Sequence, residues 1–322
     1  MNQTLDKTAG ARVAAPTATP SPTRRPPYVV ITPARNEEQF IERTVQSMVQ
    51  QTVRPERWVI VDDGSTDRTA ELVGRYAAHH DFIRLVRMER DAQRDFAKKV
   101  GAFNRGLAEL HDLEYEFIGN IDADMSFGAD YFEKILAVFE HEPTLGLSGG
   151  IVHTRYTDAF KTYDYTLDSV GGKVQLFRRR CFEQIGGYRA LKWGGIDATA
   201  EIMARMQGWQ VRKSLEAPAY EHRPTGFAYG NPLKIKWCEG RRFHSLGYDP
   251  VFFTLRCLAR AGEHPFMAGS VAAWLGYLAC LVRRAPVAVP DDVARYLRRE
   301  QRDKLRARWR AVAAALSARS QT

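Results

Sequence analysis

Cysteine is scarce in this sequence, and no cysteine lies at a metal-binding spacing from another. The 322 residues contain only Cys181, Cys238, Cys257 and Cys280, and no C-x-x-C pair occurs. The sequence therefore predicts neither a disulfide framework nor a zinc site. It favours a reducing cytoplasm as the compartment.

Two glycine-rich phosphate-binding loops are also missing. An NAD-binding Rossmann domain needs G-x-G-x-x-G after its first strand, where this chain has TPARNE. The GxxxxGK[ST] loop of P-loop NTPases does not occur either. If the protein binds phosphate groups, their charge must be neutralised by something other than a glycine cradle.

The N-terminal segment lacks the apolar stretch of a signal peptide and is rich in Thr, Ala and Pro, so we expect a disordered leader over residues 1–27. The rest is long enough for one large domain or two small ones. The net charge of +9 is uneven, because residues 283–322 hold 11 Lys/Arg and 4 Asp/Glu, a net of +7. This local basicity indicates an anionic partner, either a membrane surface or a nucleic acid.

Beyond the leader, β-rich runs alternate with helical patterns. Apolar runs at 28–32, 58–61, 83–87 and 117–121 predict four strands, and amphipathic segments between them predict helices. We expect Asn36 to cap the first of these helices. The order predicts an α/β fold with a mostly parallel sheet and helices on both faces. Ligands of such sheets bind at the carboxyl ends of the strands.

Polar clusters follow three of the predicted strands, as PARNEE, DDGSTD and DAD. In a parallel sheet all three would meet at one edge. Asp122 and Asp124 are two residues apart, so in an extended chain they point the same way. A Mg²⁺ or Mn²⁺ ion would relieve their repulsion and share its shell with substrate phosphates. A plain acidic turn, with Asp124 capping the next helix, would give the same pattern.

The DDGSTD cluster has a partly structural explanation. Gly64 turns the chain, and Ser65, Thr66 or Asp67 can cap the next helix. This does not account for both Asp62 and Asp63. A carboxylate at this strand end can accept a hydrogen bond from a ribose hydroxyl or a base N–H.

Several segments in fixed order resemble the family 2 glycosyltransferases with the GT-A fold. They are VVITPARNEE, VIVDDGSTDRTAELV, AFNRGL, IDADMSF and GGKVQLFRRRCFEQIGGYRALKWGGIDATAEIMARMQGW. The similarity runs from about Tyr28 to about His222. It implies a Rossmann-like catalytic domain over 28–225, with a nucleotide-sugar half (28–125) and an acceptor half (126–225). A helical C-terminal extension over 226–322 would follow.

The resemblance implies a nucleotide-sugar donor and assigns residues to it. The loop around the nucleotide is matched by Pro33, Ala34, Asn36 and Glu37. The acids that contact base and ribose are matched by Asp62 and Asp63. The metal-binding D-x-D motif that bridges the diphosphate is matched by Asp122 and Asp124. Lys98, with Arg94 and Lys99, lies in a segment that can approach the nucleotide. Solvated helix-surface charges are an equal alternative for these three.

Asp197 matches the catalytic base of the family, although Ile196 replaces the Glu of the usual Glu-Asp pair. A helix-capping role for Asp197 is the alternative, and Glu201, one helical turn later, is the second candidate for the base. His222 matches a histidine near the diphosphate or metal, with a surface histidine as the alternative. The family implies a single displacement that inverts the anomeric carbon.

The C-terminal region carries a long uncharged stretch. Residues 265–282 contain 18 consecutive uncharged residues, at the lower limit for a spanning helix, and a basic helical pattern follows over 291–319. We expect either a core helix or an interfacial segment on the cytoplasmic leaflet. Sparse aromatic residues in the basic segment argue against nucleic acid. The expected location is the cytoplasm, with peripheral contact to an anionic membrane through 249–322 as the finer alternative.

These patterns predict a metal-dependent, hexosyltransferase-like glycosyltransferase that uses Mn²⁺ or Mg²⁺. Its acceptor would be a hydroxyl of a saccharide or lipid-linked saccharide, in polysaccharide or cell-envelope glycan synthesis. The alternatives are a sugar nucleotidyltransferase and a non-catalytic protein that binds membranes or nucleic acid through the basic tail.

Overall fold

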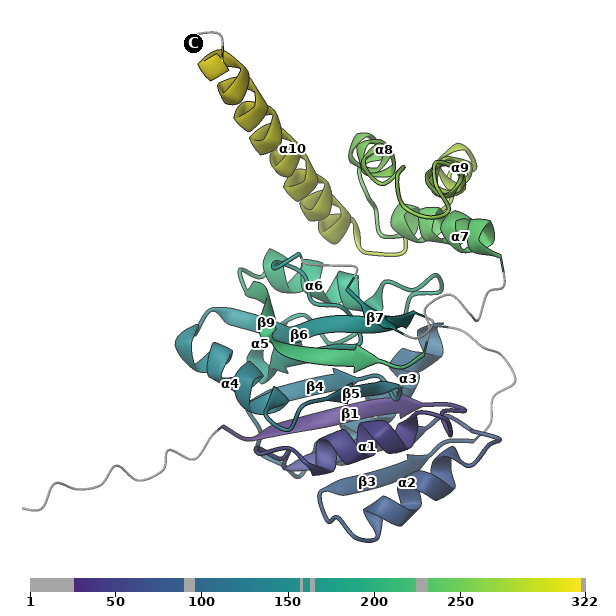
Figure 1. Ribbon diagram of the computed structural model, residues 1–322, viewed down its shortest axis with the longest axis vertical. Coiled ribbons are helices and arrows are strands. Elements are labelled where there is room, and N and C mark those ends of the chain that lie inside the picture. Colours follow the sequence, from purple (N-terminus) through teal and green to yellow (C-terminus); the bar gives the residue numbers. More distant parts are fainter. Residues whose placement is uncertain (1–25, 90–95, 157–158, 163–165, 224–230, 320–322) are drawn as a thin grey trace, which may run out of the picture.

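A computed structural model describes residues 26–89, 96–156, 159–162, 166–223 and 231–319 (Figure 1). Residues 1–25 of the predicted leader, and Arg94, lie outside the described residues.

The described residues form one nine-stranded mixed sheet. Its strands are β1 (Tyr28–Ala34), β2 (Arg57–Asp62), β3 (Ile83–Arg87), β4 (Phe117–Ile121), β5 (Met125–Phe127), β6 (Leu145–Tyr156), β7 (Ala159–Lys161), β8 (Val174–Arg178) and β9 (Gln210–Glu221). The order across the sheet is β3-β2-β1-β4-β8-β6-β9-β5, with β7 paired to β6.

Helices flank the sheet and then continue beyond it. Those between and beside the strands are α1 (Ile41–Val49), α2 (Thr69–Ala77), α3 (Phe96–Leu107), α4 (Tyr131–His141), α5 (Arg179–Gln184) and α6 (Ile196–Met206). A short 3-10 helix covers Ala108–Leu110. The C-terminal helices are α7 (Pro232–Ser245), α8 (Pro250–Ala259), α9 (Ala268–Val282) and α10 (Asp291–Arg319).

The first four strands confirm the predicted parallel arrangement. β1 pairs in parallel with β2 and β4, and β2 pairs in parallel with β3. Side chains alternate between two cores: Ile31 and Val59 belong to one hydrophobic cluster, whereas Val30 and Trp58 belong to the other. Both faces are therefore covered, as the continuous apolar runs predict.

The sheet becomes mixed beyond β4. Strand β8 pairs antiparallel with both β4 and β6, while β6 and β9 pair in parallel. This inserts a strand from the second half of the chain directly beside β4. The segment that precedes β8 consequently lies next to the Asp122–Asp124 turn, where the N–H of Asp122 donates to the carbonyl of Lys173 at 2.9 Å.

The predicted capping role of Asn36 is wrong. Helix α1 begins at Ile41, and Asn36 has a left-handed backbone with φ of 55°. Its N–H donates to Ser65 Oγ at 3.0 Å, and its side-chain oxygen accepts from the N–H of Thr66 at 2.8 Å. Asn tolerates this conformation better than most residues, so Asn36 joins two loops.

The C-terminal helices pack on one another through small residues. A Cβ added to Gly240 in α7 would lie 1.9 Å from the carbonyl oxygen of Ala273, and one added to Gly276 in α9 would lie 2.2 Å from that of Trp237. Glycine at these two positions lets α7 and α9 approach closely. Figure 1 shows α8 and α9 on the same side of α7, while α10 projects away from the rest of the molecule.

None of the helices formed by the described residues combines the length and apolarity needed to cross a bilayer. Helix α9 has 15 residues and so measures only about 22 Å against an apolar bilayer thickness of roughly 30 Å.

Gly240→Ala should destabilise the protein by about 3 kcal/mol, because the added methyl group meets backbone that has no room to move. Thermal unfolding would measure this. Gly101→Ala in α3 is the matched control, since its Cβ would meet nothing within 4 Å, and alanine there should stabilise by up to about 1 kcal/mol. An unchanged melting temperature for Gly240→Ala would contradict the packing of α7 on α9.

Candidate active site

A cleft of about 310 Å³ opens at the carboxyl ends of β1, β2 and β4. The polar clusters after the three predicted strands do meet there. Four carboxylates line the cleft, from Glu37, Asp63, Asp122 and Asp124. Five cationic side chains line it as well, from Arg35, Lys98, Lys99, Lys173 and Arg223. Pro33, Ala34, Ala102 and Ala123 complete the wall.

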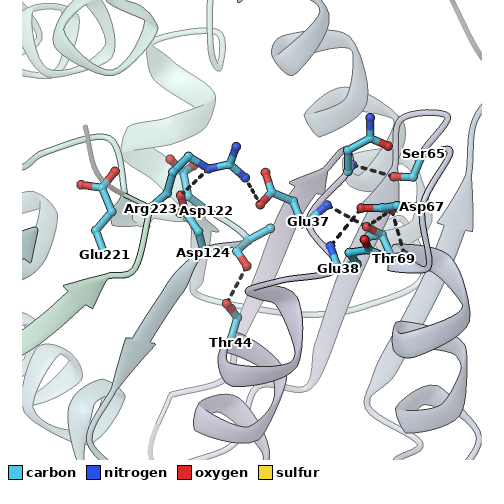
Figure 2. A network of polar contacts seen from close by, with 12 residues as sticks. Glu37, Glu38, Thr44, Ser65, Asp67, Thr69, Asp122, Asp124, Glu221 and Arg223 are labelled. Atoms are coloured by element: carbon cyan, nitrogen blue, oxygen red, sulfur yellow. Dashed lines mark hydrogen bonds and ion pairs between the residues drawn. The ribbon is translucent and has the colours of Figure 1, made fainter. Parts of the chain in front are cut away.

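The loops after β1 and β2 are fixed to one another by hydrogen bonds from backbone N–H groups to side-chain oxygens (Figure 2). The N–H of Glu37 donates to Thr69 Oγ1 at 2.7 Å, and the N–H of Glu38 donates to Asp67 Oδ2 at 3.1 Å. Asp67 also accepts from the N–H of Thr69 at 3.0 Å. Asp67 and Thr69 thus hold the loop that places the Glu37 carboxylate in the cleft.

Of the two adjacent aspartates at the end of β2, only Asp63 lines the cleft. Asp62 is buried, and its Oδ1 accepts the N–H of Ser65 at 3.1 Å, which closes the turn. Asp63 faces Arg35, whose Nη1 lies 3.5 Å from Asp63 Oδ2. Neighbouring residues in an extended chain point in opposite directions, so one aspartate shapes the loop and the other meets solvent in the cleft.

Asp124 is the most enclosed carboxylate of the cleft. It is 6% exposed, and its Oδ1 is buried without a hydrogen-bond partner among the described residues. Burial, together with the Asp122 carboxylate, raises the pKa of Asp124 to about 6. The turn around it is anchored from α1, where Thr44 Oγ1 donates to the carbonyl of Ala123 at 2.7 Å. Within the described part of the chain, this oxygen is therefore left without a compensating donor.

Cationic side chains from distant segments partner the carboxylates. Arg223, just after β9, lies between Glu37 and Asp124, with its Nε 3.3 Å from Asp124 Oδ2 (Figure 2). Burial raises the pKa of Glu37 to about 7 against the opposing effect of Arg223.

Asp122 has its own cationic partners. Lys99 forms an ion pair with Asp122, and Lys173 Nζ lies 3.8 Å from Asp122 Oδ2 and 2.5 Å from Glu221 Oε1. The cleft therefore combines negative charge for a cation with positive charge for an anion.

The donor set of the cleft fits a hard divalent cation. No cluster of three or more His, Cys, Asp or Glu side chains suited to a metal occurs in the described part of the chain. Mg²⁺ and Mn²⁺, however, commonly take one or two carboxylates and complete their shell with substrate phosphates and water. The orphaned Asp124 Oδ1 and the adjacent Asp122 provide such a pair.

His222 lies beside this region with both ring nitrogens engaged. Arg43 Nη1 lies 3.2 Å from Nδ1, and Ser126 Oγ lies 2.7 Å from Nε2. Because a guanidinium can only donate, Nδ1 accepts and Nε2 carries the proton. Burial, Arg43 and Arg155 lower the pKa of His222. Metal binding by His222 stays a prediction, and it would have to displace these contacts.

A second pocket of about 180 Å³ adjoins the cleft. Lys99, Asp122 and Lys173 line both spaces, so the two share a wall at the D-x-D turn. Phe103 and Tyr188 line the second pocket with aromatic surface, and Asp197 lines it with a carboxylate. A molecule in the second pocket would therefore face one in the cleft across Asp122.

Asp197 lies in the first turn of α6 and is held by the chain before β8. The N–H of Gly172 donates to Asp197 Oδ2 at 3.1 Å. A Cβ at Gly172 would lie 2.6 Å from that oxygen, so only glycine permits this approach. The residue before α6 is Gly195, with a left-handed backbone and no side-chain cap. The Asp197 carboxylate is thus oriented by Gly172 and lies in the wall of the second pocket.

Glu201, the second candidate, is buried behind this pocket. It is 5% exposed and accepts the N–H of Val170 at 2.7 Å and the hydroxyl of Ser169 at 3.0 Å. Burial, with a contribution from Asp197, raises the pKa of Glu201 to about 8. It is not among the residues that line the pocket. Glu201 therefore anchors the 169–170 segment to α6.

The elevated pKa of Glu201 predicts a pH-dependent stability. The folded protein keeps this proton up to about pH 8, whereas the unfolded chain releases it near 4.5. The folded state binds more protons between these values, so the free energy of unfolding should fall by roughly 3–5 kcal/mol as pH rises through them. Glu201→Gln keeps an oxygen for Val170 and should remove the contribution of Glu201, leaving the fall that the raised pKa values of Glu37 and Asp124 produce.

Urea unfolding at about pH 5 and about pH 8 would measure the difference. Glu183→Gln on α5 is the control, because the Glu183 side chain is 60% exposed and should leave the wild-type dependence intact. A Glu201→Gln variant with the wild-type slope would contradict the assignment.

The model of glycosyl transferase family 2 matches residues 29–203, more than half of the chain. The chain belongs to glycosyl transferase family 2. The match begins in β1 and ends in α6, so it contains the cleft carboxylates and Asp197.

Relatives of this family 2 protein include two bacterial proteins. It is 25% identical to the probable glycosyltransferase YdaM of Bacillus subtilis (strain 168), over 72% of this chain and 59% of that protein. It is 29% identical to the poly-beta-1,6-N-acetyl-D-glucosamine synthase of Staphylococcus aureus (strain COL), over 64% of this chain and 52% of that protein. The chain thus spans between half and three fifths of the length of these curated relatives.

Two solved structures share the fold. The mannosyltransferase PcManGT from Pyrobaculum calidifontis, in complex with GDP-Man and Mn²⁺, has a TM-score of 0.54 at 20% identity, over 93% of this chain and 83% of that chain. S. aureus TarS 1–349, in complex with UDP-GlcNAc, has a TM-score of 0.50 at 14% identity, over 78% and 71%. At these identities the likeness concerns the fold, and it confirms the expected GT-A architecture.

Three cationic side chains that line the cleft of the family 2 protein were not among the predicted site residues: Arg35, Lys173 and Arg223. Glu221, the ion-pair partner of Lys173, was not among them either. Lys173 and Arg223 were detectable only as cations close to sequence features already singled out, the GGKV run and His222. Their partners lie far away in the sequence, since 186 residues separate Arg223 from Glu37. The local periodicity of apolar and polar residues does not predict contacts between residues so far apart in the sequence.

Proposed function

We propose that this protein transfers a sugar, with inversion, from a nucleotide-sugar donor to a hydroxyl of a saccharide or lipid-linked saccharide acceptor. The main support for the proposal is the wall that the cleft shares with the second pocket. The charged cleft and the pocket of Asp197 meet at Lys99, Asp122 and Lys173, so a donor diphosphate and an acceptor hydroxyl would come together there.

The cleft has the chemistry to hold a nucleoside diphosphate. Its five cationic side chains exceed its four carboxylates and can compensate the diphosphate charge. Asp63, which lines the cleft, would accept a hydrogen bond from a ribose hydroxyl or a base N–H. The solved structures of similar fold support a hexose donor, because they hold GDP-Man and UDP-GlcNAc.

Asp122 and Asp124 would hold the divalent cation, Mn²⁺ or Mg²⁺. When bound, such an ion neutralises charge that develops on the departing diphosphate. PcManGT was solved with Mn²⁺, which supports this choice. Lys99 and Lys173, which pair with Asp122, would turn toward the phosphate oxygens.

Asp197 is assigned as the general base. Its carboxylate takes the proton of the acceptor hydroxyl while that oxygen forms a bond to the anomeric carbon. The bond between the anomeric carbon and the diphosphate oxygen breaks on the opposite face, and the nucleoside diphosphate leaves with the electron pair. One displacement of this kind inverts the anomeric configuration.

The broader role proposed is the synthesis of polysaccharide or cell-envelope glycan. The similarity to a poly-beta-1,6-N-acetyl-D-glucosamine synthase supports a saccharide acceptor. We further assign the donor to residues 28–125, the acceptor to 126–225 and membrane contact to the helices after 226. Peripheral attachment to the cytoplasmic face of the membrane would bring a lipid-linked acceptor within reach.

Release of nucleoside diphosphate tests the proposal. The full chain, Mn²⁺ and a panel of sugar nucleotides should yield diphosphate release when a glycan or glycolipid acceptor is added, and thermal shift should reveal the preferred donor. Absence of both binding and release for every common donor would refute it. Pyrophosphate release from a nucleoside triphosphate and a sugar phosphate would instead identify a sugar nucleotidyltransferase.

A further inference from the structure

Large apolar side chains are exposed in a row on each of two C-terminal helices. On α8 the row contains Val251, Leu255 and Leu258, which are 63%, 39% and 67% exposed. On α9 it contains Val271, Trp274, Leu275 and Val282, of which Val282 is 73% exposed. Spacings of three, four and seven or eleven residues place each row on one helical face.

The two rows form one surface. Trp274 Nε1 donates to Thr254 Oγ1 at 3.1 Å, which ties the row on α9 to the row on α8. Phe266 and Met267, in the connection between the helices, are 67% and 71% exposed. We call the apolar side chains of both rows and of this connection the α8–α9 face.

The opposite faces of α8 and α9 pack into a hydrophobic cluster with α7. Phe253 and Cys257 of α8 and Ala273 and Tyr277 of α9 form a buried cluster with Phe243 of α7. The α8–α9 face is therefore surplus to folding. Contiguous apolar surface of this kind marks an interaction site.

Positive charge lies at the Val282 end of the α8–α9 face. Arg283 and Arg284 follow α9 directly and are exposed, and the chain from 283 to the end carries a net charge of +7. Much of that charge lies on α10, which projects from the molecule in Figure 1. An anionic surface complements this pattern. A second copy of the chain would bring the same cations and be repelled.

We propose that the α8–α9 face docks on the surface of an anionic lipid bilayer. Helices of 10 and 15 residues are too short to span it but can lie in the interface with their apolar rows in the acyl region. Trp274 suits that depth, because tryptophan concentrates at bilayer interfaces. The arginines after α9 would meet the anionic headgroups.

Docking would also orient the acceptor pocket. The guanidinium of Arg241 in α7 lies 3.9 Å from the ring centre of Trp193, and Leu246 packs against Gly195, which lines the pocket of Asp197. Helix α7, on which α8 and α9 pack, thus connects the α8–α9 face to the pocket wall. This consequence, a lipid-borne acceptor, rests on the proposed function, whereas the docking itself does not.

Vesicle flotation of the full chain without donor tests the docking. The protein should float with phosphatidylcholine vesicles that contain about one third phosphatidylglycerol, and far less with phosphatidylcholine alone. Leu258→Glu combined with Val282→Glu should lower partitioning roughly 100-fold or more. Arg283→Gln combined with Arg284→Gln should lower it roughly 30-fold at low salt.

Leu215→Glu is the matched control, because Leu215 is an exposed leucine on β9 of the sheet, 51% accessible. It should float as the wild type does. Donor thermal shift must be the same for all variants, which separates this test from that of the proposed function. Failure of the wild type to float, or normal flotation of the Leu258/Val282 variant, would overturn the proposal. So would a dimer that this variant dissociates without any vesicle binding.

Discussion

Asp124→Asn should abolish metal-dependent binding of the sugar nucleotide and lower transfer by about 10³-fold. Asp124 Oδ1 is the buried carboxylate oxygen that lacks a partner among the described residues. An amide in its place removes the charge on which the proposed cation depends. Titration calorimetry of a nucleoside diphosphate, with and without Mn²⁺, would measure the loss separately from turnover.

The fold should survive this substitution. Burial raises the pKa of Asp124 to about 6, so its ionised form opposes folding at neutral pH and the amide should leave the melting temperature equal or higher. Asp130→Asn is the matched control, since Asp130 belongs to the same segment and pairs with Lys134 at 2.7 Å on the surface. Metal-dependent binding that persists in Asp124→Asn would place the cation elsewhere.

The sequence was sufficient to predict which strand ends meet. The alternating order of β-rich runs and helical patterns predicted a parallel sheet with helices on both faces, and this required the polar strand ends to share an edge. Glu37, Asp63 and Asp122 do line one cleft. The sequence assigned both Asp62 and Asp63 to the nucleotide, whereas only Asp63 lines the cleft and Asp62 closes the turn through Ser65.

The other features of the candidate site could not be predicted from the sequence, because they depend on contacts between distant parts of the chain. The conformation of Asn36 follows from its hydrogen bonds to Ser65 and Thr66, which a local capping pattern does not reveal. Lys173 reaches Asp122 only because β8 inserts antiparallel beside β4. Strand order of that kind is decided by packing of the second half of the chain, and no periodicity of residues encodes it.

Asp197→Asn should leave donor binding unchanged and slow transfer by roughly 10²- to 10⁴-fold, the usual contribution of a general base. Asp197 does not line the donor cleft, and asparagine keeps an oxygen for the N–H of Gly172. A thermal-shift titration with the donor and a diphosphate-release assay would separate the two effects. Normal turnover would show that Asp197 is not the base.

Glu201→Gln distinguishes the two candidates for the base. With a pKa raised to about 8 by burial, Glu201 is mostly protonated at neutral pH and cannot accept the acceptor's proton, so its amide variant should turn over at close to the wild-type rate. Its oxygens are also committed to Val170 and Ser169. Asp197 has one oxygen held by Gly172 and lies in the wall of the pocket. An inactive Glu201→Gln together with an active Asp197→Asn would identify Glu201 as the base. The substrate would then have to reach this buried residue, so the pocket would have to open between α6 and the 169–170 segment.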